Sequence, residues 1–334
     1  MLKSLDIHLT NKCHFNCRHC LYNSGISNKD KGELNASDWI QIFTDLSRLT
    51  NGQGSINLLG GEPLMHQDFF KIATASVELG LKTNLISNFG FSDSIIKKIS
   101  KIKFHRLSFG LHGCEKNHDW LRNSKGDYKN TLKIIKLFLE FKNRPLINIT
   151  TVLHKNNLDD VISVLELGKS LNIDSQSFFF FTPVGRGMDF PTLMVDPDEW
   201  QKTKEKILDW LKKNKPRFSV KWERAYMPVS QIKQFYGGLC SGKNTSSLEV
   251  RSNGNVYYCG ILSGVNGSAV GNLKKESLSD VYKSLASKRI KGVSGCTALA
   301  ILSKNNNKKA VDPRPHNSEW TPSCPYELET LNPK

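Results

Sequence analysis

The stretch Asn11–Gly25, NKCHFNCRHCLYNSG, holds three cysteines within eight residues. Cys13, Cys17 and Cys20 are spaced C-x3-C-x2-C and follow an apolar segment, Leu5–Leu9, that predicts a β-strand. A structural zinc site usually takes four ligands in two pairs, so three clustered thiolates are one short of it. A [4Fe–4S] cube held by only three cysteines keeps one iron open for another ligand. The trio therefore favours an iron–sulfur cluster, with zinc binding or no metal as the alternatives.

Composition and charge narrow the class of protein. The chain has 334 residues, a mean hydropathy of −0.39, and neither an apolar run of membrane-helix length nor a signal peptide. We therefore expect a cytoplasmic protein, where a reducing environment makes its eight cysteines metal ligands or catalytic thiols. The net charge is +16, but the lysines are scattered along amphipathic segments. Nucleic acid is thus an improbable partner, and an acidic peptide or a phosphorylated small molecule suits the charge equally well.

A strand–helix rhythm runs through the first two thirds of the chain. Apolar segments predict six strands: Leu5–Leu9, Ile56–Leu59, Thr83–Ile86, Arg106–Leu111, Ile147–Leu153 and Ser177–Phe181. Apolar residues three and four apart predict five intervening helices: Ser37–Leu49, Asp68–Leu79, Asp93–Ile99, Thr131–Phe141 and Leu158–Leu171. Such alternation is typical of α/β folds with parallel strands. We predict a partial (β/α)6 TIM barrel, with ligands at the carboxyl ends of its strands.

The rhythm changes after a last predicted helix, Pro197–Lys213. The segment SLEVRSNGNVYYCG predicts a hairpin around Asn253-Gly254, and ESLSDVYKSL predicts a short helix. We therefore predict two domains, residues 1–218 and residues 219–334.

A second motif, NLLGGEPLMH, follows the second predicted strand. Gly60 and Gly61 allow the backbone to approach a ligand closely, and Glu62 can accept a hydrogen bond from an ammonium group. A tight turn before a helix is the alternative interpretation.

Together these two motifs resemble those of the radical S-adenosylmethionine (radical SAM) superfamily, over roughly residues 2–187. The resemblance implies that Cys13, Cys17 and Cys20 ligate a [4Fe–4S] cluster whose open iron chelates S-adenosylmethionine. Reductive cleavage of that cofactor then gives a 5′-deoxyadenosyl radical that abstracts a substrate hydrogen. An electron donor such as flavodoxin or ferredoxin is implied as a partner.

The same resemblance assigns residues to the cofactor. Gly60, Gly61 and Glu62 would bind its methionyl amino group, and His19 would lie against adenine. In LISNFG, Ser87 and Asn88 would face the cofactor. In SFGLHG, Gly110 and His112 replace a serine and an aspartate of the family pattern, which puts a ribose contact there in doubt.

The C-terminal cysteines resemble the SPASM and twitch extensions of that superfamily, which hold auxiliary [4Fe–4S] clusters. A full SPASM extension has seven or more cysteines, whereas Cys240, Cys259, Cys296 and Cys324 are the four present. The resemblance therefore implies one fully ligated auxiliary cluster, with a zinc site on the same ligands as the alternative. The gap from Cys296 to Cys324 is wider than the compact pattern.

Cys114 is the eighth cysteine and follows the fourth predicted strand. One interpretation is a small buried thiol. The other is a catalytic hydrogen-atom donor that quenches a substrate radical, as an epimerase requires.

Three functions compete. The first is modification of a ribosomally synthesised peptide by epimerisation, crosslinking or dehydrogenation, although the chain starts directly at its first strand without a separate leader-binding domain. The second is dehydrogenation of a small molecule such as an aminosugar alcohol. The third is a non-catalytic iron–sulfur or zinc protein.

Overall fold

The computed structural model describes the chain except residues 29–31, 232–245, 288–313, 316, 323–327 and 332–334. The described residues form an eleven-stranded sheet in the order β11-β10-β9-β1-β2-β3-β4-β5-β6-β7-β13 and a two-stranded sheet, β12-β8. The strands of the large sheet are β1 Ser4–His8, β2 Ser55–Leu59, β3 Lys82–Ser87, β4 Arg106–Gly110, β5 Leu146–Leu153, β6 Ser175–Phe180, β7 Ser219–Glu223, β9 Ser247–Val250, β10 Asn255–Tyr257, β11 Gly271–Asn272 and β13 Leu328–Leu331. Those of the small sheet are β8 Tyr226–Pro228 and β12 Trp320–Pro322.

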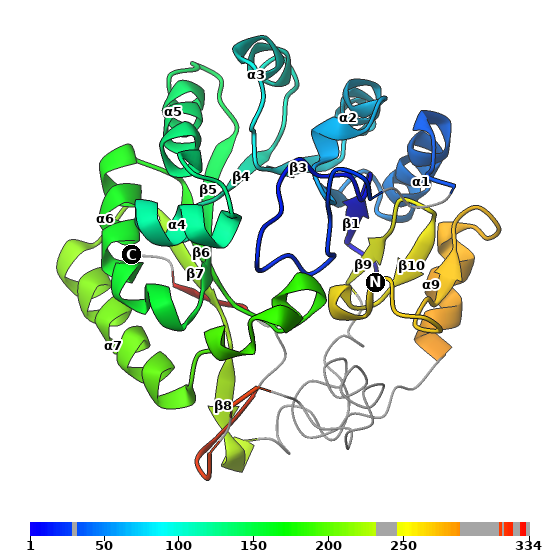
Figure 1. The fold of residues 1–334 in the computed structure, drawn as a ribbon. Coiled ribbons are helices and arrows are strands. Elements are labelled where there is room, and N and C mark those ends of the chain that lie inside the picture. Colours follow the sequence, from blue (N-terminus) through cyan, green and yellow to red (C-terminus); the bar gives the residue numbers. More distant parts are fainter. Residues whose placement is uncertain (29–31, 232–245, 288–313, 316, 323–327, 332–334) are drawn as a thin grey trace.

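Helices surround the curved sheet on its outer side (Figure 1). The α-helices are α1 Ala36–Leu49, α2 Phe69–Glu78, α3 Asp93–Ile99, α4 Glu115–Arg122, α5 Asp127–Leu139, α6 Val161–Leu171, α7 Pro197–Asn214 and α9 Leu278–Ser287. Short 3₁₀ helices lie at η1 Pro63–Met65, η2 Lys155–Asp160, η3 Gly185–Asp189, η4 Pro191–Leu193, η5 Val229–Gln231 and η7 Gly260–Leu262.

Helix α1 illustrates how local sequence builds this outer layer. The Asn35 side chain accepts hydrogen bonds from the first-turn backbone, and the Asp38 side chain accepts from the Asn35 N–H, which completes a capping box. The buried face follows the helical period, with Trp39, Ile42, Phe43 and Leu46 against the sheet. Trp200 and Trp222 are buried in the same hydrophobic core on the other side of the barrel.

The predicted partial barrel is confirmed, with additions. Strands β1 to β6 occur where the apolar segments predicted them and pair in parallel in chain order. The prediction missed β7, which pairs in parallel with β6, and α4, which precedes α5. The fifth predicted helix begins later than expected, because η2 occupies its first turns.

The predicted hairpin is also confirmed, as β9 and β10 pair in antiparallel fashion. Strand β9 runs parallel to β1 and extends the barrel sheet beyond its first strand, while β13 adds to the opposite edge beside β7. The sheet thus includes strands from both sides of the predicted boundary at residue 218, and that boundary stays a prediction.

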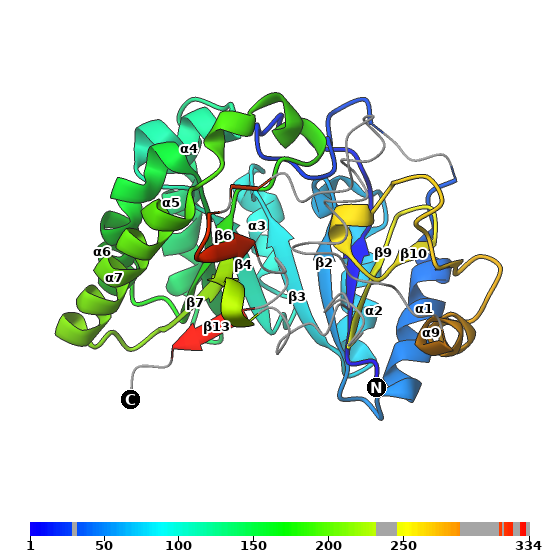
Figure 2. The same ribbon diagram turned by 90° about the horizontal axis from the view of Figure 1, so that it is seen from below.

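The carboxyl ends of β1 to β7 face one side of the molecule, where the loop after β1 crosses the centre of the ring of strands (Figures 1 and 2). This arrangement brings the three N-terminal cysteines to the mouth of the barrel. Among the described helices, none is long and apolar enough to cross a membrane.

Candidate functional site

The loop after β1 brings its three thiols to one cavity. Cys13, Cys17 and Cys20 all line a cavity of about 220 Å³, and Cys13 is the most deeply buried of them. Burial raises the pKa of Cys13 to about 12, so this thiol is neutral until a metal binds it. Among the described residues, no three His, Cys, Asp or Glu side chains gather closely enough to hold a single metal ion. All three thiols nevertheless lie on the wall of the same cavity.

Arg186 in η3 fixes the shape of this loop. Its guanidinium donates hydrogen bonds to the carbonyl oxygens of Cys17 (2.7 Å) and Ser24 (2.5 Å), and its backbone N–H donates to that of Cys20 (3.0 Å). These bonds connect the loop to a segment more than 160 residues away in the chain. The Arg186 guanidinium is thus engaged by backbone carbonyl oxygens of the cysteine loop.

The glycine pair after β2 makes room for the same loop. A Cβ added at Gly60, where φ is +138°, would lie 2.5 Å from the Thr10 carbonyl oxygen. A Cβ at Gly61 would lie 2.3 Å from that of Lys12. Both residues also line the cysteine cavity. These glycines therefore allow the turn after β2 to pack closely against the loop after β1.

Glu62 is fully buried next to the cavity. Its Oε1 accepts hydrogen bonds from the Ser87 hydroxyl (2.8 Å) and the Leu64 N–H (3.1 Å), and its Oε2 accepts from the Asn88 N–H (3.0 Å). Burial raises the pKa of Glu62 to about 7, although these hydrogen bonds oppose the rise. The predicted residues Glu62, Ser87 and Asn88 thus form one network, and Asn88 Nδ2 lies 3.7 Å from Cys13 Sγ.

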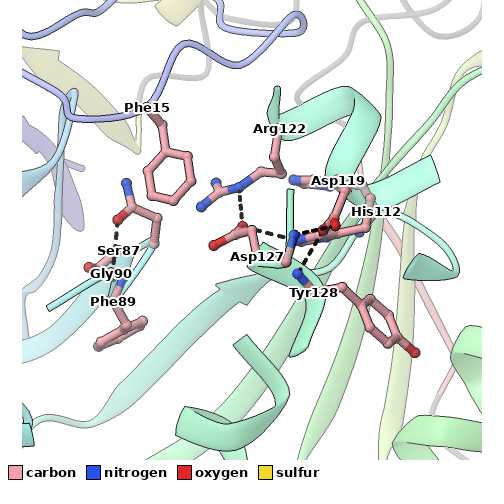
Figure 3. Close-up of polar contacts among 12 residues, drawn as sticks. Phe15, Ser87, Phe89, Gly90, His112, Asp119, Arg122, Asp127 and Tyr128 are labelled. Atoms are coloured by element: carbon pink, nitrogen blue, oxygen red, sulfur yellow. Dashed lines mark hydrogen bonds and ion pairs between the residues drawn. The ribbon is translucent and has the colours of Figure 1, made fainter. Parts of the chain in front are cut away.

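The sequence analysis missed a buried cation in this site. Arg122, at the end of α4, lines the cysteine cavity, and its Cζ lies 4.4 Å from the centre of the Phe15 ring. Asp127 Oδ2 accepts hydrogen bonds from Arg122 Nε (2.9 Å) and His118 Nε2 (3.0 Å), as Figure 3 shows for the arginine. One carboxylate therefore holds Arg122 in place while the guanidinium still faces the cavity.

Histidines close the site on the side of β4. His19 lines the cysteine cavity, and its ring centre lies 4.6 Å from that of His112. Burial and the charge of Arg122 lower the pKa of His19 to about 3, so its imidazole is neutral. A Cβ at Gly110 would lie 3.0 Å from His112 Nε2. The two departures from the family pattern are therefore linked, because the histidine occupies space that a side chain at position 110 would need.

A second cavity, of about 330 Å³, adjoins the first. His19, Leu21 and Tyr22 line both cavities. The rest of the second wall comes from the carboxyl ends of β5, β6 and β7 and from η7: Thr150, Val152, Phe179, Phe180, Thr182, Glu223 and Ile261. This wall is mostly apolar, and among the described residues that line it Glu223 is the only one with a carboxyl group.

The remaining predicted residues lie apart from these cavities or outside the described residues. Cys259 is buried with Val184, Ile261 and Leu262, whereas Cys240, Cys296 and Cys324 lie outside the part of the chain that the structure describes. Cys114 precedes α4, where its N–H donates to Asp160 Oδ2 (2.8 Å), and it lines neither cavity. Its role as a hydrogen-atom donor stays a prediction.

Comparison with known families identifies the class. Residues 7–168 match the radical SAM superfamily, and residues 240–311 match SPASM, an iron–sulfur cluster-binding domain. The chain is therefore a radical SAM protein, and more particularly one with a C-terminal SPASM domain. Membership implies [4Fe–4S] clusters and S-adenosylmethionine as its cofactors. The SPASM match includes Cys240, Cys259 and Cys296 and ends before Cys324.

Several curated proteins are similar in sequence. An AdoMet-dependent heme synthase from Methanosarcina barkeri is 26% identical over 295 residues, which cover 82% of this chain and 80% of the relative. The sporulation killing factor maturation protein SkfB of Bacillus subtilis is 29% identical over 49% of this chain, and the PqqA peptide cyclase of Ruegeria pomeroyi is 27% identical over 49%. These matches span 38% and 43%, respectively, of the latter two proteins.

Solved structures share the fold. Streptococcus suis SuiB bound to S-adenosylmethionine has a TM-score of 0.73 at 20% identity, over 95% of this chain and 77% of that one. The enzyme anSMEcpe with bound AdoMet has a TM-score of 0.65 at 18% identity, over 84% and 80%.

The residues of the cysteine cavity fit the implied cofactors. Three thiols share its wall, which suits a cube held at three of its corners. Arg122 supplies a buried positive charge for a carboxylate, and buried Glu62 supplies an acceptor carboxyl group. The carboxylate and the ammonium group at the amino acid end of the cofactor would thus each have a complementary group, Arg122 and Glu62 respectively.

Proposed function

We propose that this chain is a radical SAM enzyme that removes a hydrogen atom from a ribosomally synthesised peptide. When bound, the cluster and S-adenosylmethionine supply the radical that takes this hydrogen. The observation that carries the proposal is the pair of adjoining cavities, one lined by cysteines and one mostly apolar, which share His19, Leu21 and Tyr22. A substrate side chain in the second cavity would lie directly beside the cofactor in the first.

The charged, thiol and imidazole side chains of the first cavity would then each have a role. Cys13, Cys17 and Cys20 would ligate the cluster, held by Arg186 and the glycine pair in the shape described above. Arg122 would hold the carboxylate of the cofactor, because it is a buried cation that lines the cysteine cavity and bonds to Asp127 through its Nε. His19, neutral and shared between the cavities, would lie between cofactor and substrate.

Peptide modification is supported by the relatives from Bacillus subtilis and Ruegeria pomeroyi, whose names describe a maturation protein and a peptide cyclase. The apolar cavity is small and suits one large side chain rather than a whole cofactor-sized molecule. Epimerisation, crosslinking and dehydrogenation are all compatible with this arrangement.

A small-molecule substrate is the second candidate. It is favoured by the Methanosarcina barkeri heme synthase, whose similarity extends over 82% of this chain, beyond the barrel and into the C-terminal part.

Anaerobic reconstitution tests the enzymatic proposal. The wild type should bind about eight irons, from two four-iron cubes, and the Cys13/Cys17/Cys20 triple alanine variant about four. With a reductant, the wild type should release 5′-deoxyadenosine from S-adenosylmethionine, and the triple variant should not. Equal iron content in the two proteins, or no 5′-deoxyadenosine from the wild type, would refute the proposal.

The substrate class needs a separate measurement. Short peptides encoded beside the gene should change mass, or take up solvent deuterium, when incubated with the reconstituted enzyme. If no peptide changes while a small molecule is consumed, the second candidate holds instead.

A further inference from the structure

Glu223 is the last residue of β7, the strand that the sequence analysis missed, and it ends at the mouth of the barrel. Its side chain is 2% exposed. Oε2 accepts a hydrogen bond from the Phe180 N–H (2.7 Å). Oε1 is buried and has no hydrogen-bond partner among the described residues. A buried carboxyl oxygen without a partner costs free energy unless something else supplies the hydrogen bond.

The polar groups around Glu223 do not supply that hydrogen bond among the described residues. Among the hydroxyl groups in the same cavity, Tyr22 donates to Glu249 Oε2 (3.3 Å) and Thr182 donates to the Phe180 carbonyl (3.3 Å), while Thr150 accepts from Asn148 Nδ2 (3.0 Å); none of these bonds reaches Glu223. His19 Nδ1 is the other buried polar atom of this wall without a partner among the described residues, and it lies where the two cavities meet.

Electrostatics agree with this geometry. Burial raises the pKa of Glu223 to about 7, while the hydrogen bond from Phe180 and the charge of Arg314 oppose the rise. The carboxyl group is thus poised to accept a hydrogen bond strongly once a donor enters the cavity.

We propose that Glu223 selects the substrate: the second cavity takes an apolar or aromatic group that bears one hydrogen-bond donor, and Oε1 accepts that donor. The rest of the wall, with Val152, Phe179 and Ile261, buries the apolar body. This assignment rests on the proposed enzymatic function, because that function makes the cavity beside the cofactor a substrate site. A site built around a buried acceptor discriminates strongly against an analogue that lacks the donor.

A matched pair of probes tests the assignment without turnover. 4-Ethylphenol and ethylbenzene have nearly the same shape and differ in the hydroxyl group. Their dissociation constants are measured by ligand-observed NMR on the anaerobic full-length protein at pH 8. The wild type should bind 4-ethylphenol about tenfold more tightly or better, since a hydrogen bond to a charged group contributes at least this much.

Variants identify the acceptor. Glu223→Leu should remove the preference for the phenol, whereas Glu223→Gln, which keeps an acceptor oxygen, should retain part of it. Glu205→Leu, the same change at an exposed carboxylate on α7 that lines neither cavity, is the control and should leave the preference unchanged. Thermal unfolding of each variant verifies that it is folded.

Three results would overturn the assignment: no binding of either probe to the wild type, equal affinities for the two, or a preference that survives in a folded Glu223→Leu protein. Loss of S-adenosylmethionine cleavage with intact probe discrimination would instead refute only the proposed function.

Discussion

The buried pair of Arg122 and Asp127 gives the sharpest quantitative prediction. The two side chains are 9% and 2% exposed, and Asp127 also accepts from His118, which is fully buried. Asp127→Asn keeps the shape and removes the charge, so it leaves a buried guanidinium without a counter-ion. Removing one partner of such a pair costs about 3–5 kcal/mol of stability.

The pH of the measurement follows from the same contacts. Burial alone would raise the pKa of Asp127, but the hydrogen bond from His118 and the charge of Arg122 bring that pKa below its usual value of 3.8. A carboxyl group whose pKa is lowered by folding contributes stability above its unfolded pKa, and this contribution is lost as the pH falls through its folded pKa. The full cost of Asp127→Asn should therefore be present at pH 7.

Urea unfolding of the cluster-free, reduced protein measures that cost. Asp93→Asn is the matched control, because Asp93 pairs with Lys133 in a bridge whose two side chains are 68% and 66% exposed. The control should lose at most about 1 kcal/mol. If Asp127→Asn lies within about 1 kcal/mol of the control, then the buried pair does not hold Arg122 as we infer.

Three further predictions concern the cavities. Gly61→Ala should lower the iron content after reconstitution to about four per chain, because the new Cβ would lie 2.3 Å from the Lys12 carbonyl oxygen. The control is Gly25→Ala, whose Cβ would make only ordinary 3.8 Å contacts, and it should keep about eight irons. Burial raises the pKa of Glu223 from 4.5 to about 7, so folding should lose stability as the pH rises from 4.5 to 7.5 and this carboxyl group ionises. Over that range the wild type should lose roughly 3 kcal/mol more than Glu223→Gln, measured by urea unfolding. An equal dependence of unfolding free energy on pH in the two proteins would contradict this. Cys114→Ala should give unchanged products by mass spectrometry, because Cys114 lines neither cavity; a lost or altered product would support its role as a hydrogen-atom donor.

Apolar periodicity predicted the barrel well where the buried faces are apolar. Strands β1, β2, β4 and β5 were evident because their buried residues are mainly aliphatic or aromatic, whereas β3 and β6 also bury several polar side chains. Helix α4 was missed because its buried residues are His118, Leu121 and Arg122, which leave almost no apolar pattern to detect. Strand β7 was missed because SVKWE is short and comes where the strand–helix rhythm stops.

The site residues that were predicted have a distinctive pattern in the sequence, and those that were missed have none. Cysteines and paired glycines are rare enough in such spacings to identify a site from the sequence. Arg122 and Glu223 are charged residues in a chain with many of them, and nothing in the sequence distinguishes a buried charge from a solvated one. Burial depends on the neighbouring elements that cover a side chain, and those elements come from distant parts of the chain.

The cysteine loop shows why such distant contacts matter for the chemistry. Its backbone is fixed by Arg186 from η3 and by the glycine turn after β2, while the cation that faces its thiols comes from α4. Three separate crossovers must therefore be in place before the thiols share one cavity. The spacing of the three cysteines alone therefore does not determine the shape of their loop, because the groups that bond to its backbone come from other crossovers of the barrel.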